Sequence, residues 1–174
     1  MSRETNLKRM IFQQRGIDHI VDADIMARAL NKLTELEIDL SGGHLSTLFR
    51  YMSDSTELKV LDLHSSESNI YNTEIAFTVA PNVLSNALSK LDTLYMVNTH
   101  LTESQIYSVF NKLQFEGPSN LDLGSCDIFN VPLHILKKVS KRLNNTNAFA
   151  RRLRFKIVQL EEESLSDQIS QREE

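Results

Sequence analysis

Residues 79–96 read VAPNVLSNALSKLDTLYM, and residues 21–38, VDADIMARALNKLTELEI, carry the same pattern 58 residues earlier without a gap. Six of the 18 aligned positions are identical, and three more exchange one apolar residue for another. A third copy, VPLHILKKVSKRL, begins at Val131, 52 residues after the second. Recurrence of this kind indicates a repeat architecture, in which each unit buries its apolar face against its neighbours.

The first part of each copy has the spacing of an amphipathic helix. Its apolar residues recur at helical intervals, as Ile25, Met26, Ala29, Leu30 and Leu33, and again as Val83, Leu84, Ala87, Leu88 and Leu91. Pro81 and Pro132 stand where a helix tolerates proline, and Asp22 and Asn82 have N-cap chemistry. With two similar runs elsewhere, the sequence predicts helices over residues 24–33, 45–53, 82–90, 103–113 and 133–143.

A short Leu-rich alternation follows each helix and predicts a strand. The expected strands, all parallel, are Leu36–Ile38, Leu61–Leu63, Leu94–Met96 and Leu121–Leu123. Their starts lie 25, 33 and 27 residues apart, and the longest unit holds residues 65–77, SSESNIYNTEIAF, as an inserted loop. A further strand at Met10–Phe12 is expected, with its register open.

Residues 91–113, LDTLYMVNTHLTESQIYSVFNKL, resemble a leucine-rich repeat of the long, helix-containing type found in ribonuclease-inhibitor-like and F-box-associated proteins. The family's Asn/Cys position after each strand is occupied by Ser41, Ser66, Thr99 and Cys126, and no Asn stands there. The resemblance covers about residues 7 to 143. It implies an α/β fold, a short leucine-rich-repeat solenoid whose curved parallel sheet has helices on the convex side.

Charge divides the rest of the chain. We expect an N-terminal cap segment over residues 1–20, the repeat domain over 21–143 and a tail over 144–174. Eight basic residues and no acid lie from Lys137 to Lys156, and six acids and one Arg follow from Glu161. These blocks predict a solvated helix or, alternatively, a patch that binds polyanions. After Leu143, either a degenerate strand caps the sheet or the chain departs from its repeats. The last ten or so residues hold too little apolar content to pack and are expected to be disordered.

Composition excludes several functional classes. Hydrophobic residues make up 41% and charged residues 24%, as in a globular protein, and the apolar runs are too short to cross a bilayer. The N-terminus has no apolar signal region and Cys126 is the single cysteine, so a cytoplasmic protein is expected. The five His residues show no metal-ligand spacing, and no phosphate loop or nucleophile elbow is present. We therefore expect no metal, no cofactor and no enzymatic activity.

Side chains alternate across a strand, so the residues between the strand leucines face away from the helices. In the expected register this concave face holds five acids and no Lys or Arg, with His64 and Tyr95 near its middle. Repeat proteins commonly bind partners on such a face. The predicted partner-binding residues are Glu35, Glu37, Asp39, Asp62, His64, Tyr95 and Asp122.

These observations predict a non-catalytic protein–protein interaction module, either a scaffold or a substrate-recognition piece, whose partner presents a basic surface. Two alternatives stay open. One is an inhibitor or regulator of a basic enzyme, as the resemblance to ribonuclease-inhibitor-like proteins implies. The other is a polyanion binder acting through residues 137–156. No small-molecule substrate is expected, and nucleic acid is not the favoured partner of a chain with a net charge of −4.

Overall fold

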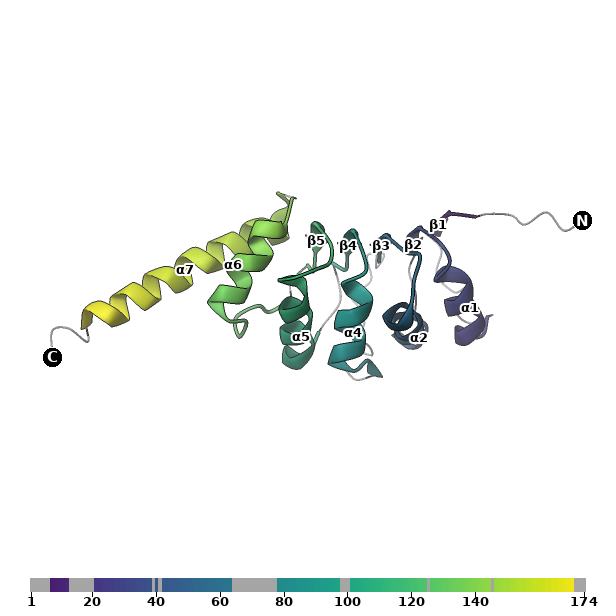
Figure 1. Ribbon diagram of the computed structural model, residues 1–174, viewed down its shortest axis with the longest axis horizontal. Coiled ribbons are helices and arrows are strands. Elements are labelled where there is room, and N and C mark those ends of the chain that lie inside the picture. Colours follow the sequence, from purple (N-terminus) through teal and green to yellow (C-terminus); the bar gives the residue numbers. More distant parts are fainter. Residues whose placement is uncertain are drawn as a thin grey trace, which may run out of the picture.

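The computed structural model describes residues 7–12, 21–38, 40, 42–63, 78–97, 101–124, 126–144 and 146–170. These residues form an α/β fold with one five-stranded parallel sheet and six helices (Figure 1). The strands are β1 (Arg9–Phe12), β2 (Glu35–Ile38), β3 (Val60–Asp62), β4 (Thr93–Tyr95) and β5 (Asn120–Asp122). The helices are α1 (Ala23–Leu30), α2 (Gly42–Asp54), α4 (Pro81–Leu88), α5 (Glu103–Leu113), α6 (Leu133–Arg142) and α7 (Ala148–Ser170).

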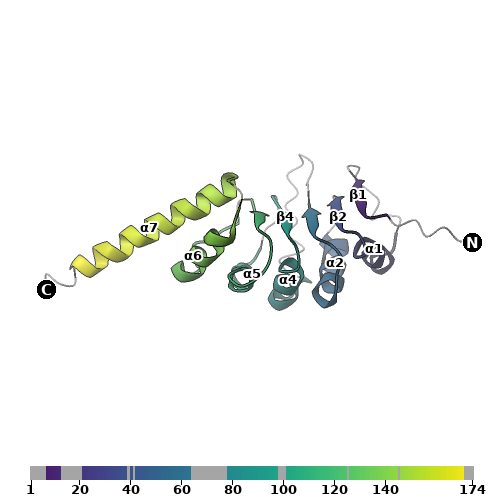
Figure 2. The ribbon, with the colours of Figure 1, turned by 45° about the horizontal axis from the view of Figure 1, so that its top comes forward.

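The strands lie side by side in chain order, β1 to β5, and each of the four pairings is parallel. Helices α1, α2, α4 and α5 stand in a row on one side of the sheet (Figures 1 and 2). We call the opposite side of the sheet the open face. The expected loop over residues 65–77 lies outside the described residues.

One row of side chains joins the sheet to the helices. The strand register places five apolar residues opposite one another on neighbouring strands, Met10, Leu36, Leu61, Leu94 and Leu121. We call this set the leucine row. Each of its leucines is at most 1% exposed. Burying a leucine fully contributes about 1.5–3 kcal/mol relative to leaving it exposed, so the leucine row is a major source of stability.

The predicted strands are confirmed in position and direction, but each begins one residue before its predicted start. The backbone hydrogen bonds explain the shift. Lys59 and Val60 both donate their N–H groups to the carbonyl of Thr34, and Asp92 and Thr93 repeat this arrangement on Lys59. The ladder therefore begins before the first buried leucine, and except at Val60 it begins at a residue whose polar side chain gives no hydrophobic signal.

The helix starts follow local capping chemistry. Asp22 caps α1, since its carboxylate accepts hydrogen bonds from the N–H groups of Asp24 and Ile25. Pro81 opens α4 as expected, but Ala80 is the N-cap residue, so Asn82 does not cap this helix. In α5, by contrast, Thr102 and Gln105 form a reciprocal capping box.

Beyond α6 the chain departs from its repeats, the second of the two expected outcomes. One further hydrogen bond of the ladder forms, from the N–H of Asn144 to the carbonyl of Ser119, and α7 then begins instead of a sixth strand. Helix α7 continues to Ser170, past the point where the low apolar content predicted disorder. A side-chain contact one turn apart, the bond from Gln159 to Glu163, lies just before this part of the helix.

Candidate functional site

The open face of the sheet carries two transverse rows of side chains. The strand register aligns the first row as Arg9, Glu35, Val60, Thr93 and Asn120. It aligns the second as Ile11, Glu37, Asp62, Tyr95 and Asp122, which we call the central row. Neighbouring strands in a sheet are about 4.8 Å apart, so each member of a row lies directly beside the next.

The central row combines negative charge with an aromatic ring. Tyr95 stands between Asp62 and Asp122 in register, and Glu37 lies on the other side of Asp62. All four side chains are partly exposed. Carboxylates this close share one electrostatic field, which attracts cations and is screened by salt. The structure thus brings together four of the predicted site residues.

Asp122 is held in place by two donors. Its Oδ1 accepts a 2.9 Å hydrogen bond from the N–H of Gly124, and its Oδ2 accepts a 3.0 Å bond from the Nδ2 of Asn147. Asn147 also donates to the carbonyl of Leu121 and caps the start of α7 by accepting from Ala150. A fixed carboxylate loses less side-chain entropy when a partner binds it.

The expectation that the face holds no cation is wrong. Arg9 of β1 lies beside Glu35 in register, and its Nε is 3.1 Å from Glu35 Oε2. The register of β1 was open at the sequence level, because a four-residue strand contains too little alternation to define it. Of the other predicted site residues, Asp39 and His64 lie outside the described residues.

Sequence reasoning missed three residues of this surface. Arg9 and Ile11 belong to it once β1 is in register, and Asn147 reaches it from α7. The alternation in RMIF at residues 9–12 is the signal that could have identified the first two. No local pattern could have identified Asn147, because its contact with Asp122 spans 25 residues and a change of element.

Two arginines of the basic segment, Arg142 and Arg152, serve the fold. Arg142 donates to the carbonyl oxygens of Phe115 and Gly117, beyond the end of α5. Arg152 donates to the carbonyls of Gly124 and Cys126 in the loop after β5. These bonds satisfy backbone acceptors at the C-terminal end of the sheet, where no further strand follows among the described residues.

Two lysines of the segment, Lys137 and Lys156, also have intramolecular contacts. The Nζ of Lys137 forms an ion pair with Glu161 of α7. The Nζ of Lys156 lies 4.4 Å from the centre of the Phe129 ring, and this lysine is buried. For these four basic residues, the contacts favour a structural role over a polyanion-binding one.

Cys126 has the environment of a core residue. Its side chain is buried in the hydrophobic core, and burial raises the pKa of its thiol to about 11. At neutral pH such a group is protonated, and the thiol form is a weak nucleophile. This environment matches the structural role expected from its position after a strand.

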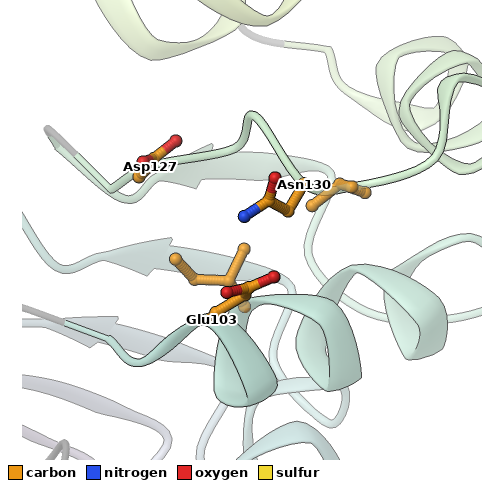
Figure 3. A pocket seen from close by; sticks show the side chains of 5 residues that line it. Glu103, Asp127 and Asn130 are labelled. Carbon is orange, nitrogen blue, oxygen red and sulfur yellow. The ribbon is translucent and has the colours of Figure 1, made fainter.

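A small pocket of about 120 Å³ opens between the start of α5 and the loop after β5, lined by Glu103, Ile106, Asp127, Asn130 and Val131 (Figure 3). Ligand sites are commonly about 300–1,000 Å³, so this pocket is undersized for a substrate. Asp127 also has a local role, because it accepts a hydrogen bond from the N–H of Phe129. Within the described part of the chain, no cluster of three His, Cys, Asp or Glu residues could hold a metal ion.

Among the described helices, none combines the length and apolar character needed to cross a membrane. Neither a scan against protein-family models nor searches of curated proteins and of solved structures finds a match to this chain. The function must therefore be argued from the surface itself.

Proposed function

We propose that this chain is a leucine-rich-repeat protein that binds another protein on the open face of its sheet, without catalysing a reaction. The single observation that carries the proposal is the central row, in which Glu37, Asp62 and Asp122 share one line with Tyr95. The consecutive parallel strands and the leucine row support the repeat assignment, since each unit contributes one strand and one buried leucine.

The chemistry of the row defines the partner. Tyrosine is enriched among residues that dominate binding energy, because its ring buries much area with little loss of entropy. The flanking carboxylates favour Arg and Lys on the partner and accelerate encounter with a basic surface. Ile11, 47% exposed at the β1 end of the row, extends the surface with an apolar contact. The partner is therefore a protein with a basic patch that also presents an apolar contact for Tyr95.

The test is the triple variant Glu37→Lys, Asp62→Lys, Tyr95→Ala, used as bait in a lysate of the source cell. A matched control also changes two acids and one tyrosine, but away from the row, with Glu57→Lys, Glu103→Lys and Tyr107→Ala, all exposed positions. Captured proteins are quantified at about 0.05 M and about 0.3 M salt, because the higher salt concentration shortens the distance over which the acidic side chains attract a basic partner.

We expect the triple variant to lose the proteins that the wild type captures, the control to retain them, and the higher salt to weaken capture by the wild type. Both variants must keep the circular dichroism spectrum of the wild type. If the folded triple variant retains every partner, the open face is not the binding site.

A further inference from the structure

Helix α7 has a second face that none of the described residues covers. The helix contacts α6 and β5, its residues Phe149 and Leu153 are buried, and an ion pair joins Lys137 of α6 to Glu161. The remainder of the helix extends away from the sheet (Figures 1 and 2). The surface of α7 opposite α6 is a second exposed surface, separate from the open face of the sheet.

An apolar stripe runs along this uncovered face. Phe155, Val158 and Leu165 are 71%, 50% and 60% exposed. Their spacings of three and seven residues are those of coiled-coil core positions, which stay on one side of a helix. Arg151 and Glu162 occupy the intervening positions of the same heptad pattern, and both are exposed. The hydrophobic signal of α7 is thus divided between an inner face and an outer stripe.

The charges of α7 are arranged so that the helix complements its own reverse. Its first half carries Arg151 and Arg154, and its second half carries Glu161 and Glu162. Two copies packed antiparallel would place each basic half against the acidic half of the other, whereas parallel packing would align like charges. One antiparallel register places apolar residues opposite apolar residues and basic residues opposite acidic ones at the same time.

In this register Phe155 packs against Val158 of the second copy. In an antiparallel pair, one helix runs toward its N-terminus where the other runs toward its C-terminus. Arg151, four residues before Phe155, therefore lies opposite Glu162 of the second copy, four residues after Val158. The flanking residue Arg154 then lies beside Glu161. Because the arrangement has twofold symmetry, every pair occurs twice. We propose that α7 is a homodimerisation helix, which pairs antiparallel with α7 of a second copy along Phe155 and Val158.

The first test is the mass of the wild-type protein in sedimentation equilibrium over a micromolar-to-millimolar concentration series. We expect the mass to rise with concentration from 19.9 kDa toward twice that value, because a short stripe supports a reversible dimer. Phe155→Asp should hold the protein as a monomer. Ile25→Asp is the matched control, since Ile25 is 66% exposed on α1, and it should dimerise like the wild type.

The second test distinguishes this register from other ways of associating. Arg151→Glu and Glu162→Arg each create two like-charge contacts per dimer and should raise the dissociation constant about tenfold. The double variant that carries both substitutions in one chain restores opposite charges and should regain the affinity of the wild type. A wild type that stays monomeric, a Phe155→Asp dimer, or a double variant no tighter than the single ones overturns the proposal.

Discussion

The leucine row and the central row lie one residue apart on the same strands, yet they differ in solvent exposure and in charge. The leucines are closed off from water between the sheet and the helices. The central row is partly exposed and consists mainly of acids and one tyrosine. The comparison teaches that a single register buries one row of side chains in the core and leaves the next row open to solvent, because successive side chains of a strand point in opposite directions.

The comparison predicts its largest effect at adjacent residues. Leu94→Ala should lower the free energy of unfolding by about 2–5 kcal/mol, because the truncated side chain leaves a cavity in a fully buried site. Tyr95→Ala should lower it by about 1 kcal/mol or less, because it removes only cross-strand contacts. Urea denaturation of both variants measures the difference. A Leu94→Ala loss below about 0.5 kcal/mol would show that the leucine row is not the core.

The second effect is expected at the end of the central row, where the loop after β5 turns tightly. Gly124 has a φ of +55°, and a Cβ there would lie 1.8 Å from the carbonyl oxygen of Val97. Gly124→Ala should therefore destabilise the protein by about 1–3 kcal/mol or more, as the backbone shifts to relieve the clash. Gly43→Ala is the control, because a Cβ at this helical glycine meets nothing within 4 Å. That variant should be unchanged or up to about 1 kcal/mol more stable in the same titration. Equal behaviour of the two variants would contradict the turn geometry.

The third effect concerns the contact between α7 and the open face. Asn147→Ala removes the cap of α7 and the hydrogen bonds to Leu121 and Asp122, so a loss of about 1–3 kcal/mol is expected. Asn82→Ala, at an exposed position of α4, should change stability by about 0.5 kcal/mol or less. Thermal unfolding compares the two. If they are equally stable, Asn147 does not hold the edge of the sheet.

The smallest effect is expected at the single ion pair of the first row. Arg9 and Glu35 are well exposed, so a double-mutant cycle of Arg9→Ala and Glu35→Ala should give a coupling of about 0.2–1 kcal/mol that disappears at high salt. Capture of a basic partner should increase in the Arg9→Ala variant, because removing Arg9 makes the open face more negative. Weaker capture of a basic partner by Arg9→Ala would contradict the proposed charge preference.

Much of the fold could be predicted because its signals are local. The spacing around Leu94 and Leu121 indicates strands, the runs before them indicate helices, and the recurrence of the pattern indicates parallel order. Five of the predicted residues, Glu35, Glu37, Asp62, Tyr95 and Asp122, lie on the open face as side-chain alternation alone predicted. Asp39 and His64 lie outside the described residues, so their predicted place on the face stays a prediction.

What could not be predicted depends on contacts between distant residues. The pairing of Arg9 with Glu35 needs the register of β1, which four residues do not define. The end of the sheet was ambiguous because Asn144 continues the backbone ladder by one bond with no apolar side chain to mark it. The basic block looked like a surface patch, since composition does not reveal that Arg142 and Arg152 bind backbone carbonyls.

The sequence by itself determined the repeating strands and helices, and with them the separation of the leucines from the acids. These properties depend on periodicity, which is written in consecutive residues. Only the tertiary structure decided which charges lie side by side, how Asn147 joins α7 to Asp122, and which face of α7 stays uncovered. Those properties depend on contacts that close long stretches of chain, and such contacts form only when the whole core packs.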